Sequence, residues 1–355
     1  MRNPVFRFLQ RILWAIGSHV NSIIVPLLVL FVLWNIIGFM VVWLDRRRAM
    51  QNRRQMPESA LLFFVICGAG IGTFLAMKLF YHQTQKTKLK IAHVIGLSLA
   101  FIFLIHVVEG MTLGRIVVYR EIDFYSPNWP VALDGYRIGF MADKHRTSDE
   151  TMRQVIDELN NRNLDLLLLG GDFSMGNNHY IGTLREIAQT ITTDGIWGVE
   201  GNHDRYQQLF AAKEAFGIGV LNNTGYTIRP GFFLAGVHDL WHREPDIALA
   251  ITDATPDSFI LVISHNPDVS MQQDTTHVDF MLAGHTHGGQ VTFFGWPFYL
   301  LFGTITQYGT RFAGGFAESL DGSPVFTTVG LVEYYMWPRV FNRPEVVIFT
   351  MFHGE

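Results

Sequence analysis

Two histidines separated by a single residue are the clearest chemical feature of this sequence. His285 and His287 follow an apolar run, residues 278–283, that predicts a short buried strand. If the backbone stays extended through Thr286, both imidazole rings project to the same side, because side chains alternate along a strand. Such a pair could bind a metal ion, although a polar loop with two surface histidines would have the same sequence.

Four other strand-like runs also end in residues that could bind a metal. The residues at these ends are Asp143, His145, Asp172, Asn202, His203, Asp204 and His265. Open α/β sheets place their binding sites at the carboxyl ends of their strands, so we expect these side chains to lie close together. Carboxylate, imidazole and amide ligands without cysteine suit Mn, Fe, Zn or Mg.

The order of these motifs resembles that of the calcineurin-like metallophosphoesterases. Segments 220–223, 264–268, 284–290 and 342–346 are similar to the bacterial membrane-associated branch that contains the YkuE- and YaeI-type phosphodiesterases. The resemblance extends from Val117 to the C-terminus. It implies an α/β fold, the metallophosphoesterase αββα sandwich of two mixed sheets, and a metal-dependent phosphoric ester hydrolase.

The resemblance also implies two divalent metal ions held by seven side chains. It assigns Asp143, His145 and His287 to one ion, Asn202, His265 and His285 to the other, and Asp172 to both as a bridge. Two such ions about 4 Å apart would clamp a phosphoryl group and acidify a bridging water, so that a metal-activated hydroxide attacks in line. The catalytic His203 would stabilise the phosphoryl oxygens and help to protonate the leaving oxygen, unless its ring only supports the Asn202 loop.

Three neighbouring residues have less direct roles. We expect Asp204 to orient its loop rather than to touch substrate, and Lys144 to point away from the metals into solvent. Related enzymes often carry an acidic residue near the position of Met175, and that residue can orient the catalytic histidine. Asp204 or a backbone carbonyl must then orient His203, or the activity is lower.

Composition limits the class of protein. The chain has 355 residues, 49% of them hydrophobic, and its mean hydropathy of +0.20 is high for a soluble enzyme. A net charge of −4 argues against a nucleic-acid polymer as partner, because binding one needs a clustered basic surface. The one cysteine, Cys67, excludes an intramolecular disulfide. We therefore expect membrane segments beside a soluble domain.

The apolar segments lie near the N-terminus. Residues 5–20 predict an amphipathic helix at a membrane interface, and residues 23–44, 60–81 and 91–108 are each long enough to span the lipid bilayer. We place the membrane module at residues 1–110. With three spans, the protein would be a multi-pass protein of the bacterial inner membrane.

Residues 35–97 resemble a small bacterial membrane-domain family of unknown function. The resemblance rests on the basic run 45–49, the Pro-Glu pair at 57–58 and the glycine-rich run 68–72. It implies no known chemistry, so the role of this module stays open.

The basic residues bear on the orientation of the enzyme. With three spans, the loop with arginines at 46–54 shares a side with the C-terminal domain, and the lysines at 86–90 lie with the N-terminus on the other side. Basic residues favour the cytoplasmic side, and these counts nearly balance. If the first helix lies flat, its arginines join the first loop, and the count then favours a cytoplasmic catalytic domain.

The rest of the chain predicts one soluble domain. Residues 111–134 predict a loop-like linker, and residues 135–355 predict the metallophosphoesterase domain. Ser148 is a suitable N-cap for an amphipathic helix that ends at Asn160. Strands and helices alternate up to the strand before Gly201, which predicts parallel strands covered by helices.

Residues 292–316 are unusual because they are rich in aromatic side chains. They begin three residues after Gly289, and the aromatic run 334–338 could add to them. One interpretation is a strand and loop that cover the edge of the core. The other is an exposed apolar loop that dips into the bilayer beside the metals and admits a lipid phosphoester.

From these features we expect a membrane-anchored, dinuclear-metal phosphohydrolase. The reaction class favoured is that of a phosphodiesterase or pyrophosphate-cleaving enzyme, and the substrate favoured is a membrane-associated phosphoester, such as a lipid-linked one. No obligate protein partner follows from the sequence. Two alternatives stay open: a tethered phosphodiesterase for soluble nucleotides, and a non-catalytic metal-binding sensor or scaffold.

Overall fold

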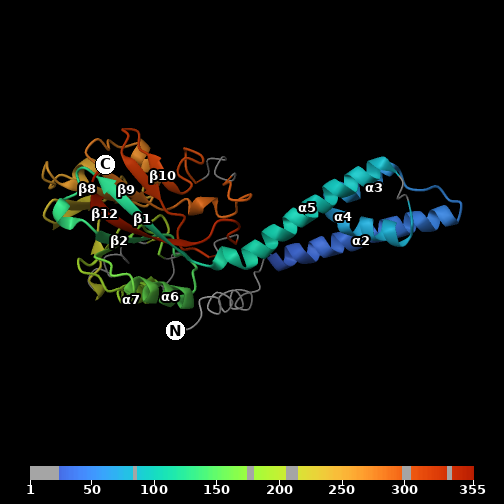
Figure 1. Cartoon of the computed structure of the whole chain (residues 1–355), viewed down its shortest axis with the longest axis horizontal. Helices are drawn as coiled ribbons and strands as arrows, with labels where there is room; N and C mark the ends of the chain where they lie inside the picture. Colours follow the sequence, from blue (N-terminus) through green and yellow to red (C-terminus); the bar gives the residue numbers. More distant parts are fainter. Residues whose placement is uncertain (1–23, 83–85, 174–179, 205–214, 298–304, 334–337) are drawn as a thin grey trace. The chain divides into compact units, whose positions relative to one another are not determined.

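The structure is a computed structural model that describes six segments of the chain. These are residues 24–82, 86–173, 180–204, 215–297, 305–333 and 338–355. The predicted interfacial helix at 5–20 and Met175 lie outside the described residues. The chain divides into two compact units, Met1–Leu113 and Gly114–Glu355 (Figure 1).

The first unit is helical in its described part. Its elements are α2 (Ile24–Met50), α3 (Glu58–Phe64), the π-helical turn η1 (Val65–Ala69), α4 (Gly70–Leu79) and α5 (Thr87–Met111). Three stretches are long and apolar enough to cross a membrane: Val25–Met50, Glu58–Leu79 and Thr87–Arg115. In length and composition they correspond to the three predicted spans.

The middle stretch is interrupted at Gly68, which has a φ of +99° that ordinary helical residues do not adopt. Beyond this turn, α4 packs along α2. Gly72 lies so close to Asn35 that an added Cβ would come within 1.8 Å of the Asn35 carbonyl oxygen. Further along, the rings of Phe80 and Phe39 have centroids 5.7 Å apart. The residue numbers of these contacting pairs rise along both helices, so α4 runs in the same direction as α2.

Before the turn at Gly68, α3 runs antiparallel to α2 and α4. Leu61 of α3 packs in one apolar cluster with Val42 of α2 and Leu89 of α5. Deeper in the unit, Val65 lies against Gly96 of α5, where an added Cβ would come within 2.4 Å of the Val65 carbonyl oxygen. α3 and α4 therefore form a helical hairpin, and the start of α3 and the end of α4 lie at the same end of this unit.

The second unit is built on two six-stranded sheets. The first sheet has the order β1-β12-β2-β3-β4-β5 and consists of β1 (Val118–Ser126), β2 (Tyr136–Met141), β3 (Leu166–Leu169), β4 (Ile196–Gly198), β5 (Gly219–Val220) and β12 (Glu345–His353). Strands β2, β3 and β4 are parallel, as the alternation of strands and helices predicted. The C-terminal strand β12 lies between β1 and β2, parallel to β1 and antiparallel to β2.

The second sheet has the order β10-β11-β9-β8-β7-β6. Its strands are β6 (Thr224–Arg229), β7 (Phe232–Gly236), β8 (Phe259–Ser264), β9 (Phe280–Ala283), β10 (Gly315–Glu318) and β11 (Pro324–Thr327). Strands β7, β8, β9 and β11 are parallel, and the edge strands β6 and β10 are antiparallel to their neighbours. Both sheets are therefore mixed.

Buried side chains fill three layers of this unit. The central layer joins the two sheets and includes Phe140, Leu168, Leu261 and Phe349. The helices α6 (Asp149–Asn160) and α7 (Tyr180–Ile187) contribute to a second apolar cluster on the first sheet, and α9 (Ile247–Ala250) contributes to a third on the second sheet (Figure 1). This is the predicted αββα sandwich, so the fold class is confirmed.

The predicted helix with Ser148 as its N-cap is also confirmed, as α6. The Ser148 hydroxyl accepts a hydrogen bond from the Thr151 N–H at 3.1 Å, as an N-cap does. The predicted loop-like linker at 111–134, by contrast, was wrong where it covers β1. Residues 119–126 belong to β1, whose nine residues pair with β12. Arg120, Glu121 and Asp123 hid the strand signal, and its partner strand comes from the far end of the sequence.

Candidate metal centre

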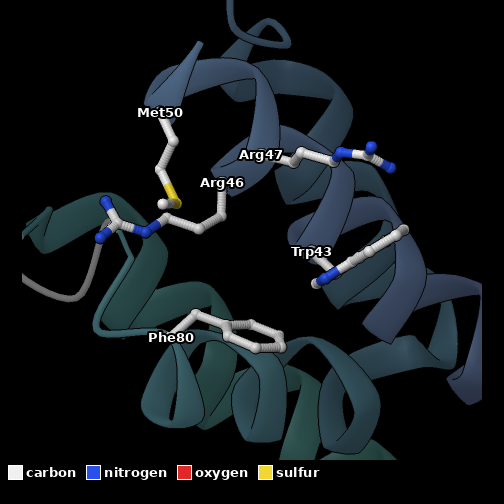
Figure 2. A pocket seen from close by; sticks show the side chains of 5 residues that line it. All are labelled: Trp43, Arg46, Arg47, Met50 and Phe80. Atoms are coloured by element: carbon white, nitrogen blue, oxygen red, sulfur yellow. The ribbon is translucent and has the colours of Figure 1, made fainter.

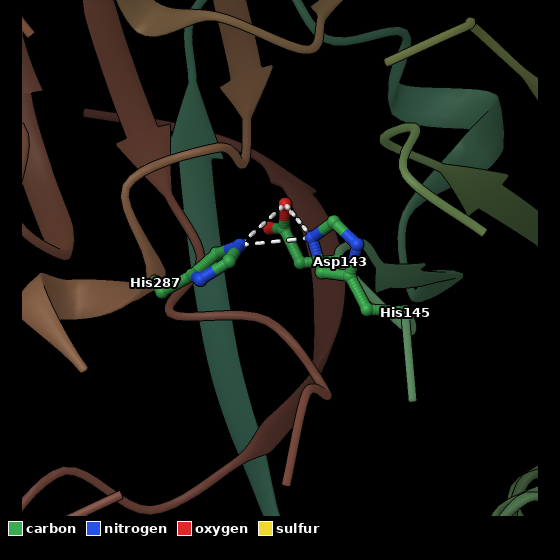
Figure 3. A group of neighbouring side chains, drawn as sticks. All are labelled: Asp143, His145 and His287. Carbon is green, nitrogen blue, oxygen red and sulfur yellow. Dashed lines mark hydrogen bonds and ion pairs between the residues drawn. The ribbon is translucent and has the colours of Figure 1, made fainter. Parts of the chain in front are cut away.

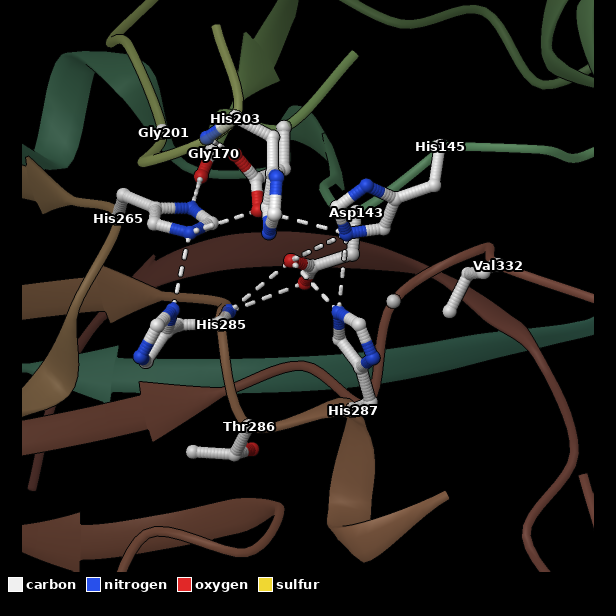
Figure 4. A network of polar contacts seen from close by, with 12 residues as sticks. Asp143, His145, Gly170, Gly201, His203, His265, His285, Thr286, His287 and Val332 are labelled. Carbon is white, nitrogen blue, oxygen red and sulfur yellow. Dashed lines mark hydrogen bonds and ion pairs between the residues drawn. The ribbon is translucent and has the colours of Figure 1, made fainter. Parts of the chain in front are cut away.

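The seven predicted ligands all follow strand ends of the two sheets. Asp143 and His145 follow β2, Asp172 follows β3, Asn202 follows β4, His265 follows β8, and His285 and His287 follow β9. Figure 4 shows the loops after these strands meeting around a group of imidazole rings. The contacts described below bring all seven side chains into one site.

Asp143, His145 and His287 form the first group, whose potential ligand atoms all lie within 4.8 Å of one another (Figure 3). The Nε2 atoms of His145 and His287 are 3.1 Å apart. Oδ1 of Asp143 lies 3.4 Å from Nε2 of His287 and 4.0 Å from Nε2 of His145. Three ligand atoms thus converge on one point, as one divalent ion requires.

His265 is the centre of the second group. Its Nε2 lies 3.1 Å from Oδ1 of Asn202, 3.2 Å from Nδ1 of His285 and 3.2 Å from Oδ2 of Asp172. Its other ring nitrogen, Nδ1, lies 2.7 Å from the carbonyl oxygen of Gly170, which fixes the ring orientation. A backbone partner on the second nitrogen is the usual support for a metal-binding histidine.

Asp172 connects the two groups. Its Oδ2 lies 3.3 Å from Nε2 of His145 in the first group and 3.2 Å from Nε2 of His265 in the second. Its Oδ1 accepts a hydrogen bond from the backbone N–H of His203 at 2.7 Å. Asp143, Asp172 and His265 also form a second set of potential ligand atoms within 4.8 Å.

The backbone around the two histidines is not the extended segment that we predicted. β9 ends at Ala283, His285 has a φ of +71°, and His287 begins the 3₁₀ turn η5 (His287–Gly289) with a φ of +50°. The two rings therefore reach different neighbours, His265 and His145, rather than projecting side by side. Asp143 and Asp172 also have positive φ, at +52° and +58°. Such strained conformations cluster at functional sites.

Glycines let the loops approach the carboxylates. An added Cβ at Gly201 would come within 2.2 Å of Oδ1 of Asp172, and one at Gly284 within 2.7 Å of Oδ2 of Asp143. Neither position has room for a side chain while the carboxylates keep their places. The glycines of the Gly-Asn-His-Asp and Gly-His-x-His motifs are therefore required by close packing.

Burial and charge act together on the titrating groups. Burial alone would raise the pKa of Asp172, but His265 and His145 hold it well below its usual range. Burial lowers the pKa of His145 and of His285 to about 3, so both rings are neutral at pH 7. Burial also opposes a charge on His265, but Asp172 outweighs that effect and raises its pKa. Neutral imidazoles and ionised carboxylates are the forms that bind divalent metals, so Asp172, His145 and His285 are already in the binding form, and His265 would release a proton when a metal binds.

Asp204 holds the loops together, as we predicted. Its Oδ2 accepts hydrogen bonds from the backbone N–H groups of Asp172 at 2.6 Å and Gly201 at 3.0 Å, and its Oδ1 accepts one from Phe173 at 3.0 Å. Burial, followed by the charge of Asp172, raises the pKa of Asp204 to about 8, although these backbone donors act in the opposite direction. Through these three hydrogen bonds, Asp204 connects the loop after β3 to the loop after β4, beside Asp172.

The prediction for Lys144 was wrong. We expected an exposed side chain, but the residue is buried at 5% relative exposure. Burial lowers its pKa, while Asp149, Glu186 and Glu333 act to raise it. The expectation assumed an extended segment, whereas Asp143 and His145 on either side both have positive φ, which turns Lys144 inward.

Four residues near the site were missed as site residues. Arg339 donates to the carbonyl oxygen of His287 at 3.3 Å, and Asn342 donates to the same oxygen at 2.6 Å. The Trp241 ring lies 4.7 Å from the His285 ring in a T-shaped arrangement, and His242 Nε2 lies 2.8 Å from the Asn202 carbonyl oxygen. Trp241 and His242 could have been found from the sequence, because polar residues follow strand β7 as they follow the strands that precede the candidate ligands.

The aromatic segment after the site is exposed where the structure describes it. Phe293, Phe294 and Trp296 have relative exposures of 48%, 51% and 55%. Residues 298–304 and 334–337, which hold other aromatic residues of the prediction, lie outside the described residues. The described part favours the exposed loop over the interpretation as a cover for the core.

Comparison with known proteins agrees with this geometry. Residues 136–289 match the family described as calcineurin-like phosphoesterase, and residues 35–89 match a protein family of unknown function, DUF1294. The uncharacterized metallophosphoesterase YkuE of Bacillus subtilis is 25% identical, over 62% of this chain and 81% of its own length. The uncharacterized metallophosphoesterase Cj0846 of Campylobacter jejuni is 24% identical over 83% of this chain and 79% of its own. Phosphodiesterase YaeI of Escherichia coli is 28% identical over 61% of this chain and 82% of its own length.

The two mixed sheets, with carboxylates and imidazoles converging at their strand ends, define a metal-dependent phosphoester hydrolase. More particularly, residues 136–289 form a calcineurin-like metallophosphoesterase domain, and residues 35–89 form a DUF1294 region. The predicted family, fold and enzyme class are thereby confirmed. The three apolar helices indicate association with a membrane.

Proposed function

We propose that this chain is a dinuclear-metal phosphodiesterase or pyrophosphate-cleaving enzyme. The observation that carries the proposal is the position of Asp172, whose Oδ2 lies almost equally far from Nε2 of His145 and from Nε2 of His265. One carboxylate between two clusters of ligand atoms is the arrangement that a bridged pair of metals needs, because a carboxylate oxygen carries several lone pairs.

In this proposal two divalent ions are held by the seven residues as the resemblance implied. Asp143, His145 and His287 hold one ion, Asn202, His265 and His285 hold the other, and Asp172 contacts both. Such ions, of Mn, Fe, Zn or Mg, supply Lewis acidity and a nucleophilic water at neutral pH.

His203 is the residue we assign to substrate. Its ring centroid lies 5.2 Å from that of His145, so it stands beside the first group of ligands (Figure 4). Its backbone N–H donates to Asp172, which ties its position to the bridging carboxylate. From there the imidazole would bind a phosphoryl oxygen and give a proton to the leaving oxygen.

The substrate we favour is a phosphoester located in a membrane. YaeI, a relative of this chain, is named a phosphodiesterase. The chain carries helices that are apolar enough to cross a bilayer, and the exposed Phe293, Phe294 and Trp296 lie only a few residues after the ligand His287. Exposed aromatic residues of this kind are suited to a bilayer surface. We place the enzyme in a bacterial cell membrane as a multi-pass protein.

The first test is hydrolysis of bis-p-nitrophenyl phosphate by the detergent-solubilised protein. We expect no turnover after metal removal, recovery when Mn is added, and a loss of about 10²–10⁴-fold in a His203→Ala variant that still binds metal. His277→Ala, in an exposed loop before β9, is the matched control and should keep full activity. Two bound ions per chain without turnover would support the sensor interpretation instead.

The aromatic segment gives a second prediction. Replacing Phe293, Phe294 and Trp296 by serine in one variant should lower hydrolysis of a phosphodiester in lipid vesicles by about tenfold. The rate of hydrolysis of a soluble diester should change by less than about twofold. The physical reason is that the exposed rings act on access from the bilayer and not on the metal ligands. Equal losses for both substrates would contradict the membrane-associated substrate and favour a tethered enzyme for soluble diesters.

A further inference from the structure

The first unit carries a cleft lined by basic and aromatic side chains. Its volume is about 350 Å³, and its lining residues are Trp43, Arg46, Arg47, Met50 and Phe80. Figure 2 shows Arg46 beside Met50, Arg47 beside Trp43, and Phe80 facing them from the end of α4. The helical hairpin builds this cleft, because it returns the end of α4 to the end of α2.

Buried polar contacts fix the walls of the cleft. The Asp45 side chain is fully buried, and its Oδ2 lies 2.7 Å from Nε2 of His82, just beyond Phe80. Its Oδ1 accepts a hydrogen bond from the backbone N–H of Met56 at 2.6 Å. Asp45 therefore ties the end of α2 both to the loop that follows it and to the segment after α4.

The arginines of the cleft keep their positive charge uncompensated. The carboxylates at this end are engaged elsewhere, Asp45 with His82 and Glu58 with Lys86 at 3.8 Å. Within the described residues, neither Arg46 nor Arg47 has an ion-pair partner, and the Arg47 guanidinium instead lies 5.7 Å from the Trp43 ring. The cleft therefore combines two unpaired guanidinium groups with an apolar wall.

We propose that this cleft binds the phosphate group of an anionic phospholipid. Guanidinium groups match the geometry of phosphate oxygens, and Trp43, Met50 and Phe80 offer apolar contact to the adjoining acyl chains. The 27-residue helix α2 is about 40 Å long, longer than the hydrocarbon core of about 30 Å, so its last turns lie at the headgroup level. The apolar wall favours an amphiphile over free phosphate.

The test is binding of phosphatidylglycerol to the full chain in neutral detergent, measured by native mass spectrometry. Arg46→Gln combined with Arg47→Gln should weaken binding about tenfold to hundredfold. Arg53→Gln combined with Arg54→Gln removes the same charge from the segment that follows α2, outside the cleft, and should change binding by less than about twofold. Equal losses in both variants would overturn the site and leave only a general attraction of positive charge.

Two further arms identify the source of the phosphate. Phosphatidylcholine should bind more weakly than phosphatidylglycerol, and inorganic phosphate at millimolar concentration should not displace the lipid. Displacement by inorganic phosphate would overturn the lipid assignment. If the glutamine variants do not fold, Arg46→Lys combined with Arg47→Lys replaces them, because it keeps the charge but loses the planar donor fork of arginine. Its control is Arg53→Lys combined with Arg54→Lys, and weaker lipid binding only in the first variant supports the site.

A second inference rests on a different observation, the turn at Gly68. The Asn35 side chain donates to the Gly68 carbonyl oxygen at 3.0 Å and accepts from the Gly72 N–H at 2.9 Å, and Trp34 Nε1 donates to the Cys67 carbonyl oxygen at 2.8 Å. Non-helical backbone at membrane depth requires such protein partners, because lipid offers none. Asn35 and Trp34 thus complete the hydrogen bonds of a turn within the bilayer.

From this turn we infer that residues 58–79 enter the bilayer and leave it on the same side. Only α2 and α5 then cross, so the loops at 45–58 and 80–87 share one side and the catalytic domain lies on the other. Among the described residues, the loop side carries Arg46, Arg47, Arg48, Arg53, Arg54, Lys78, Lys86, Lys88 and Lys90, against Arg115 and Arg120 on the other side. Nine against two favours the loops in the cytoplasm and the catalytic domain outside it, whereas the counts for three spans nearly balanced and favoured a cytoplasmic catalytic domain only with the first helix lying flat.

Cysteine labelling in cells distinguishes these topologies. In a Cys67→Ala background, Gln51→Cys reports on the loop after α2, and Asp253→Cys reports on an exposed site of the catalytic domain. With a membrane-impermeant maleimide and a permeabilised outer membrane, we expect Asp253→Cys to react before lysis and Gln51→Cys only after lysis. Reaction of both before lysis, or of both only after it, would overturn the hairpin topology in favour of three crossings.

Discussion

An Asp172→Asn variant should retain its fold and lose most of its phosphodiesterase activity. The substitution keeps the size of the side chain, and Oδ1 can still accept the His203 N–H that it accepts now at 2.7 Å. It removes the negative charge that faces both His145 and His265. At about 1.5–3 kcal/mol for each lost contact with a charged group, two contacts amount to about 3–6 kcal/mol, or a factor of about 10²–10⁴ in rate.

Metal content and turnover must be measured together for this variant. We expect elemental analysis to find fewer than two ions per chain, and turnover to remain low when Mn is raised to millimolar concentration. Asp279→Asn is the matched control, since Asp279 accepts the Ile260 N–H at 2.7 Å at the opposite ends of strands β8 and β9. Full activity in Asp172→Asn would refute the bridging role, whereas loss in both variants would indicate a general loss of folding.

The parts of the site that could be predicted are those that strand order determines. The aliphatic run of β3, residues 166–169, predicts a strand buried on both faces, and parallel strands carry their sites at one end. This was sufficient to bring Asp172 together with residues about 90 to 115 positions later in the chain, such as His265 and His287. The candidate ligands therefore followed from residue type and from position after a strand, whereas their assignment to two ions came from the resemblance to the metallophosphoesterases.

The conformation of the loops could not be predicted in the same way. Periodicity treated residues 285–287 and 143–145 as extended, but the positive φ values of His285 and Asp143 are set by packing against other loops. For the same reason the burial of Lys144 could not be predicted from the pattern of residues around it. Hydropathy identifies residues 58–79 as apolar enough to cross a membrane, but it carries no information on the turn at Gly68.

Arg339 is the clearest case of a residue whose importance only the fold reveals. Its side chain is fully buried, and burial lowers its pKa to about 10, so it remains charged at pH 7. It donates to the carbonyl oxygens of Val332, Val329 and Gly330 and to that of His287 at 3.3 Å. These carbonyls lie in the loop after β11 and the loop after β9, which places Arg339 at the junction that supports His287.

Arg339→Met should therefore destabilise the catalytic domain and weaken the site. The substitution keeps an apolar stem of similar length but leaves the carbonyl oxygens without their donor, which we expect to lower the free energy of unfolding by about 3–5 kcal/mol. For a domain of this size that is a fall of about 6–20 °C in Tm, measured by thermal unfolding of the solubilised protein. Arg339→Lys should be intermediate, because one ammonium group cannot reach all of these acceptors.

The matched control is Arg153→Met on the surface of α6. Arg153 forms a surface ion pair with Glu150 at 3.1 Å, with both side chains about half exposed, so its loss should change stability by about 0.5 kcal/mol or less. If Arg339→Met unfolds at the same temperature as Arg153→Met, the buried network does not stabilise the loops. If it is destabilised and yet binds metal as tightly as the native chain, the network supports the fold but not His287, and the position of His287 must then depend on Asn342.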